Sequence, residues 1–90
     1  MTIVWTAPAV RDLRDIWNYI ADDKPDAASS HAARLREASE TLPRQPHPGK
    51  AGRVPHTREL IVAGTPYVFI YRVASRRIEI LAALHGARIR

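Results

Sequence analysis

Residues 57–84 read TRELIVAGTPYVFIYRVASRRIEILAAL, and their pattern predicts most of the sheet. The stretch holds three runs rich in β-branched and aromatic residues, at 57–62, 67–73 and 78–84. The two breaks between them, AGTP and ASRR, have the length and composition of turns. Such runs joined by short turns predict three consecutive strands in an antiparallel meander.

The first half of the chain has helical patterning after a short strand-like run at 3–5. Thr6 can cap a helix whose first turn tolerates Pro8. Apolar residues then recur at helical spacing, and the polar residues between them are expected on the solvent side. The apolar stripe consists of Val10, Leu13, Ile16, Trp17 and Ile20, and the opposite side of Arg11, Asp12, Arg14, Asp15 and Asn18.

A break at 22–25 and a second stripe predict another helix that ends at Pro43. That stripe is formed by Ala28, Ala32, Leu35, Ala38 and Leu42. Four prolines and two glycines follow within 43–55, so this segment is expected to be a loop without regular structure.

The element order β-α-α-β-β-β predicts an α+β fold. An antiparallel helical hairpin is expected to pack on one face of a small, mainly antiparallel sheet that includes the N-terminal strand. With 90 residues the chain has room for one core, so residues 1–90 are expected to form a single domain. The expected core consists of Val10, Leu13, Trp17, Ile20, Leu35, Leu42, Phe69 and Tyr71.

Composition narrows the class of protein. Hydrophobic residues make up 46 % and charged residues 26 % of the chain, which is a globular composition. Cysteine is absent, which excludes disulfide scaffolds and thiolate metal sites and fits a reducing compartment. No apolar stretch is long enough for a membrane span, and the N-terminus lacks a signal-peptide pattern. We therefore expect a cytoplasmic protein without a membrane role.

The formal net charge is +5, and arginine supplies twelve of the fourteen basic residues. Seven of the nine acidic residues precede Pro43, so the positive charge belongs to the C-terminal half. Arginine suits bidentate contact with carboxylates or phosphates. An acidic protein or a nucleic acid is the natural partner, unless arginine usage only reflects the coding genome.

The central strand at 67–73 is apolar on both faces, whereas two helices can cover only one. Burial of a Val or Ile side chain stabilises a protein by about 1.5 to 3 kcal/mol. A solvent-exposed apolar surface at Val68, Ile70 and Leu81 would therefore be unfavourable. Residues 85–90 look too short to cover this face. The pattern therefore predicts a partner protein on it.

Few residues suggest chemistry. The four histidines have no metal-binding spacing, the basic loop at 49–53 lacks a phosphate-loop pattern, and no serine lies in a nucleophile elbow; no metal or cofactor is expected. General acid–base cleavage of RNA stays open, with His85 as acid or base. Such cleavage also needs a cation to stabilise the extra negative charge on the phosphorane that forms at the phosphate. This cation would come from Arg53, Arg58, Arg72 or Arg88. Alternatively, His85 is a strand-end residue that hydrogen-bonds the backbone.

Five motifs in order resemble the RelE/ParE superfamily of toxins from bacterial type II toxin–antitoxin modules. They are A-x-x-D-L-x-x-I-W-x-Y-I at 9–20, P-x-x-G-x-x-G-R at 46–53, R-E-L at 58–60, P-Y-V-F-I-Y-R-V at 66–73 and I-L-x-x-L-H-G-A-R at 80–88. The resemblance spans nearly the whole chain. It implies a toxin neutralised by a cognate antitoxin, whose C-terminal segment wraps the toxin, and a pair that contacts operator DNA through the antitoxin.

The resemblance also implies one of two targets. RelE-like toxins cut mRNA on the ribosome, and ParE-like toxins poison DNA gyrase without a hydrolytic site. Of the RelE-like catalytic positions only Arg88 matches, because Val68 follows Tyr67 where that branch has arginine and no tyrosine follows His85. We therefore expect a ParE-like gyrase inhibitor associated with plasmid stabilisation, and no catalytic residue.

Two alternatives stay open. One is an mRNA endonuclease that uses Arg53, His85 and Arg88, and the other is an inactive homologue that only binds its antitoxin. The antitoxin segment is expected to be acidic and amphipathic. Residues expected to contact the antitoxin or the target are Arg53, Arg58, Val68, Ile70, Arg72, Leu81, His85 and Arg88.

Overall fold

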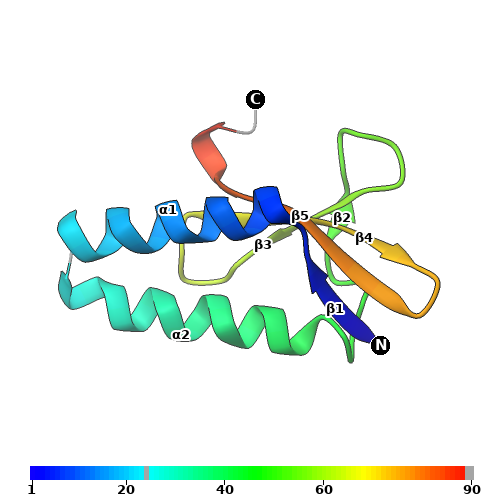
Figure 1. The fold of residues 1–90 in the computed structure, drawn as a ribbon, viewed down its shortest axis with the longest axis horizontal. Helices are drawn as coiled ribbons and strands as arrows, with labels where there is room; N and C mark the ends of the chain where they lie inside the picture. The colour runs from blue at the N-terminus through cyan, green and yellow to red at the C-terminus, as the bar shows by residue number, and fades with distance from the viewer. Residues whose placement is uncertain (24, 89–90) are drawn as a thin grey trace.

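The computed structural model describes residues 1–23 and 25–88, with the side chains of residues 23–29 and 88 left out of that description. The chain runs through a strand, two helices and four further strands to a short 3-10 turn (Figure 1). These elements are β1 Thr2–Trp5, α1 Ala7–Asp23, α2 Pro25–Thr41, β2 Lys50–Ala51, β3 Arg58–Ile61, β4 Tyr67–Ala74, β5 Arg77–His85 and η1 Gly86–Arg88. The predicted α+β class and element order are confirmed, with β2 and η1 added. Neither described helix is long and apolar enough to cross a membrane.

The five strands form one sheet in the order β1-β5-β4-β3-β2. The predicted meander of β3, β4 and β5 is antiparallel throughout, and β2 adds a two-residue antiparallel edge within the expected loop. β1 pairs in parallel with β5, so that Ile3 lies opposite Ile78 and Trp5 opposite Ile80. Beyond Ile80 the edge of β5 has no β1 partner.

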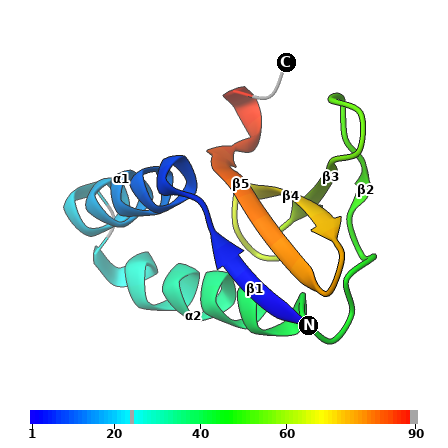
Figure 2. The ribbon, with the colours of Figure 1, turned by 45° about the vertical axis from the view of Figure 1, so that its right-hand side comes forward.

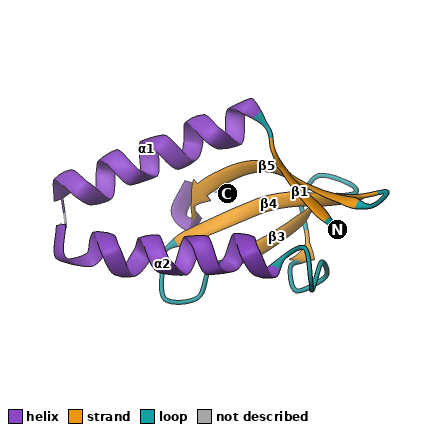
Figure 3. Ribbon diagram, turned by 60° about the horizontal axis from the view of Figure 1, so that its bottom comes forward, coloured by secondary structure: helices purple, strands orange, loops and turns teal. Residues whose placement is uncertain are grey.

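Both helices pack on one face of this sheet (Figures 2 and 3). Thr6 caps α1 as predicted, since its Oγ1 accepts a hydrogen bond from the Ala9 amide at 3.4 Å. The same hydroxyl donates to the Ile80 carbonyl at 2.8 Å, which fixes the start of α1 against β5.

The core lies between the helical hairpin and the sheet. Five of the eight predicted core residues are buried: Ile20, Leu35, Leu42, Phe69 and Tyr71. Leu13 and Trp17 are partly buried against them. The prediction for Val10 was wrong, because this side chain is 40 % exposed. Ala9, fully buried, faces the core instead, and Val10 lies about 100° farther round the helix.

The opposite face of β4 is partly covered, which corrects the expectation that the C-terminal residues are too short. The Gly86 amide donates to the Pro66 carbonyl at 2.8 Å and turns η1 over the end of the sheet. Val68 beneath it is only 6 % exposed. Ile70 and Leu81 remain half-buried, and Ile61 on the neighbouring strand is 62 % exposed.

Candidate functional site

The predicted contact residues lie in three separate places: the basic loop before β3, the outer face of the sheet, and the C-terminal end of β5. The strand register separates them. Arg58 pairs with Tyr71 and His85 pairs with Tyr67, four residues apart on β4, which is about 13 Å. Arg72 points to the face opposite both. Arg88 closes η1, and its side chain lies outside the described part of the chain.

The basic loop is held by Tyr71, which rises from β4 through the core. The Tyr71 hydroxyl accepts a hydrogen bond from the Gly49 amide and donates one to the Pro46 carbonyl, both at 3.0 Å. Arg58 Nη1 donates to the Gly49 carbonyl at 2.9 Å, so its guanidinium is partly used in holding the loop.

Arg53 lies on the same loop with an exposed side chain. Its backbone amide donates to Glu59 Oε2 at 3.1 Å, and Glu59 is 8 % exposed. The backbone at position 53 is therefore fixed while its cation faces solvent. This arrangement suits the docking of an acidic surface.

The outer face of the sheet carries a charged group beside an apolar surface. Arg72 Nε pairs with Glu79 Oε1, and Arg77 Nη2 pairs with Glu79 Oε2 at 2.9 Å. The hydrogen bond from Arg72 lowers the pKa of Glu79, and the charges of both arginines act in the same direction. Ile70 and Leu81, half-buried, lie on this face next to the ion pairs.

His85 ends β5 on the helix side of the sheet. Its Nδ1 accepts a hydrogen bond from the Ala87 amide at 3.1 Å, which matches the predicted backbone-bonded alternative. Its ring contacts the ring of Tyr67 edge to face, with 5.8 Å between the centroids.

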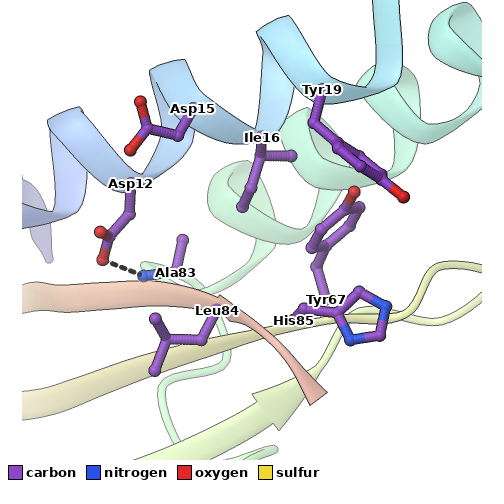
Figure 4. A pocket seen from close by; sticks show the side chains of 8 residues that line it. All are labelled: Asp12, Asp15, Ile16, Tyr19, Tyr67, Ala83, Leu84 and His85. Carbon is purple, nitrogen blue, oxygen red and sulfur yellow. Dashed lines mark hydrogen bonds between the residues drawn. The ribbon is translucent and has the colours of Figure 1, made fainter. Parts of the chain in front are cut away.

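A cavity of about 230 Å³ lies beside His85, between α1 and the end of the sheet (Figure 4). Eight side chains line it: Asp12, Asp15, Ile16, Tyr19, Tyr67, Ala83, Leu84 and His85. Asp12 Oδ2 accepts a hydrogen bond from the Ala83 amide at 3.1 Å, on the edge of β5 that β1 leaves unpaired. Burial, with a smaller effect of the neighbouring Tyr19, raises the pKa of Tyr67 above 10.0.

Among these residues only His85 is a site residue predicted from the sequence. Asp12 and Asp15 were predicted on the solvent side of α1, because their spacing fits the polar stripe. The usable signal was the spacing of Asp12, Asp15 and Tyr19, which lie three and four residues apart and thus share one helix face.

The candidate groups of the described residues are not gathered at one point. Among the described residues, no group of three or more His, Cys, Asp or Glu side chains could hold a metal ion. The one histidine with a predicted chemical role and the described arginines do not meet around one point. In the described part of the chain, the predicted site residues therefore stay in separate places.

Comparisons with known proteins agree with this description. A family model described as "ParE toxin of type II toxin-antitoxin system, parDE" matches residues 3–90. The chain is 45 % identical to Y4kP of Sinorhizobium fredii, a protein named as a toxin, over 93 % of this chain and 86 % of that one. It is 38 % identical to toxin RelE2 of Caulobacter vibrioides, over 97 % of both chains.

The fold is likewise similar to a solved structure, a chain of the chromosomal ParDE toxin–antitoxin system from P. aeruginosa. The TM-score is 0.80 at 25 % identity, covering 94 % of this chain and 95 % of that one. This chain therefore belongs to the ParE toxin family of type II toxin–antitoxin systems, within the RelE/ParE superfamily.

Proposed function

We propose that this chain inhibits growth by binding DNA gyrase in the cytoplasm and that it is not a nuclease. The observation that carries the proposal is the separation of His85 from the described arginines. Cleavage of RNA needs an acid or base and a cation at one phosphate. His85 lies about 13 Å along β4 from the Arg58 position, and the Arg58 guanidinium is directed to the Gly49 carbonyl.

A supercoiling assay with purified toxin and gyrase tests this proposal. His85→Ala should leave inhibition within about twofold of the unmodified protein, because loss of a general acid or base matters only to a chemical step, by about 10²- to 10⁴-fold. Arg53→Glu should weaken inhibition at least about fivefold, since it reverses an exposed charge on a fixed backbone. Arg14→Glu, on the exposed side of α1, is the matched control for charge reversal and should stay near the unmodified value.

The same assay contradicts the proposal if gyrase is unaffected at toxin concentrations that stop growth. A-site primer extension on translating ribosomes would then decide for the endonuclease alternative. If His85→Ala folds, binds antitoxin and has lost its toxicity, the nuclease reading replaces the proposed one. An inactive homologue would give neither gyrase inhibition nor mRNA cleavage.

We further propose a cognate antitoxin as the neutralising partner, through which the pair contacts operator DNA. Its acidic, amphipathic segment would cover Ile70 and Leu81 on the outer face of the sheet and meet the cations of Arg53 and Arg72. The half-buried apolar surface beside Arg72 supports the placement on the outer face, and the exposed side chain of Arg53 supports a second contact on the basic loop. Complementary charge raises association rates more than affinity, so the association rate should fall steeply as salt rises from about 0.05 to 0.5 M.

A further inference from the structure

The cavity beside His85 exists because β1 is shorter than β5. β1 ends at Trp5, opposite Ile80, and α1 then crosses the unpaired edge of β5. The Asp12 carboxylate satisfies the Ala83 amide on that edge at 3.1 Å. Between this contact and the end of the sheet, α1 and β5 leave a space of about 230 Å³ (Figure 4).

The cavity is acidic in a chain with a net charge of +5. Asp12 and Asp15 lie one helical turn apart on the same wall (Figure 4). Asp12 is half-buried, and its Oδ2 is engaged by a backbone amide. Among the described residues, neither carboxylate forms an ion pair with a cation of this chain. Two carboxylates without a counter-charge favour a positive ligand.

One end of the cavity is aromatic: Tyr19 continues the helix face of Asp12 and Asp15, and Tyr67 and His85 come from the sheet (Figure 4). Tyr67 is only 4 % exposed as a residue, but its hydroxyl oxygen is not sealed off, because His31 Nδ1 is the one buried side-chain atom without a partner among the described residues. In Figure 4 the hydroxyl points past the end of the cavity toward the Tyr19 ring. A hydroxyl at a cavity wall that is open to solvent is available to a ligand as a hydrogen-bond donor or acceptor. A tyrosine phenol is neutral at physiological pH, and its oxygen can accept a hydrogen bond from a cation.

We propose that this cavity binds the guanidinium group of one arginine side chain carried by a partner polypeptide. A guanidinium has five N–H donors for two carboxylates and a phenol oxygen, and its planar face stacks on tyrosine rings. A lysine ammonium lacks that planar face. A metal ion is disfavoured because no described group of three metal-ligating side chains exists.

We take this partner polypeptide to be the antitoxin of the proposed function. The identity of the partner therefore rests on the proposed function. The inference adds a contact in which the toxin supplies the acidic groups and the antitoxin supplies the basic one. An otherwise acidic antitoxin segment would carry one arginine for this cavity. Such a basic residue would help the toxin to discriminate between antitoxins, because an antitoxin without it leaves Asp12 and Asp15 partly desolvated and uncompensated.

The first test needs only the toxin. N-acetyl-arginine amide is titrated into ¹⁵N-labelled full-length protein, with N-acetyl-citrulline amide as the neutral probe of the same shape. We expect the arginine probe to shift the amide signals of Ala83, Leu84 and His85, and citrulline to bind at least about tenfold more weakly. Equal binding of both probes, or shifts spread over the basic loop, would overturn the proposal.

Variants then locate the site. Asp12→Asn and Asp15→Asn should each weaken the arginine probe about three- to tenfold, while Asn keeps the shape and, at position 12, an oxygen for the Ala83 amide. Asp22→Asn, an exposed carboxylate farther along α1, is the matched control and should stay within about twofold. A control that loses as much as the cavity variants would show general charge attraction and overturn the assignment.

The last step identifies the source of the arginine. Asp15→Asn should weaken binding of the cognate antitoxin about fivefold or more, and replacement of one antitoxin arginine should make this variant's effect disappear. Antitoxin affinity that is indifferent to both Asp12→Asn and Asp15→Asn overturns the inference while the proposed function stands. Failure to inhibit gyrase would instead remove the proposed function and leave the probe titrations unchanged.

Discussion

Tyr67 and Tyr71 lie on the same strand and point to the same face, yet they do different work. Both are buried, with exposed fractions of 4 % and 0 %. The Tyr71 hydroxyl bonds to both the Gly49 amide and the Pro46 carbonyl. The Tyr67 hydroxyl lies at the cavity wall and bonds to none of the described residues (Figure 4). The role of each buried tyrosine thus depends on the surroundings of its hydroxyl. Backbone groups of a loop surround the Tyr71 hydroxyl, whereas a cavity lies beside the Tyr67 hydroxyl.

The largest difference should appear when each hydroxyl is removed, starting with Tyr71→Phe. This change leaves the buried Gly49 amide without an acceptor and the Pro46 carbonyl without a donor. We expect a loss of about 2 kcal/mol in the free energy of unfolding, measured by urea denaturation. Faster hydrogen exchange at Gly49 should accompany it. An unchanged urea midpoint would show that Tyr71 does not anchor the loop.

Gly49→Ala breaks the same anchor from the loop side. A Cβ at this position would lie 2.8 Å from the Tyr71 hydroxyl, 2.9 Å from its ring and 3.1 Å from the Glu59 carbonyl. We expect a loss of about 1 to 2 kcal/mol in thermal or urea unfolding. Gly86→Ala is the control, since the nearest atom there is 3.3 Å away. If Gly49→Ala and Gly86→Ala lower the free energy of unfolding by the same amount, steric contact with Tyr71 does not explain the effect of Gly49→Ala.

A pH titration examines the strand next to Tyr71. The lowered pKa of Glu79 means that the Glu79 carboxylate binds a proton more weakly in the folded protein than in the unfolded chain. The contribution of the Glu79 carboxylate to the stability of the folded protein is therefore fully present above its ordinary pKa of 4.5. This contribution is lost as the pH falls through the lower pKa of Glu79 in the folded protein. Glu79→Gln should flatten the fall of the unfolding midpoint below about pH 4.5. Glu40→Gln, an exposed carboxylate on α2, should leave the fall as it is.

Tyr67→Phe should give the smallest change in stability, within about 0.5 kcal/mol in urea, because no described group loses a bond. Its effect should appear in ligand binding instead, as an arginine-probe affinity reduced about two- to threefold. A stability loss equal to that of Tyr71→Phe would mean that the Tyr67 hydroxyl is already partnered in the free toxin.

Local patterns were sufficient to predict most of the fold. Strand-forming runs with turn-length breaks predicted β3, β4 and β5, and the cap at Thr6 predicted the start of α1. The parallel pairing of β1 with β5 joins residues more than seventy positions apart, so no local pattern encodes it. The short strand β2 was missed because its pairing is imposed by the Tyr71 contacts and not by propensity.

The candidate site was less predictable, and α1 shows why. Periodicity defines a stripe but not the angle at which a helix docks, and the Thr6 contact with β5 turned Val10 outward and brought Asp12 to the sheet. The cavity depends on this rotation and on where β1 ends. The charge of the basic loop could be predicted, but which of its groups hold the backbone and which face solvent could not.

The pairing of β1 with β5 also has a consequence for when the molecule matures. The ladder of β1 cannot form its hydrogen bonds until residues 77–80 of β5 have been synthesised. The central strand β4 and the N-terminal strand β1 both depend on β5, so the five-stranded sheet is completed only after β5 has been synthesised.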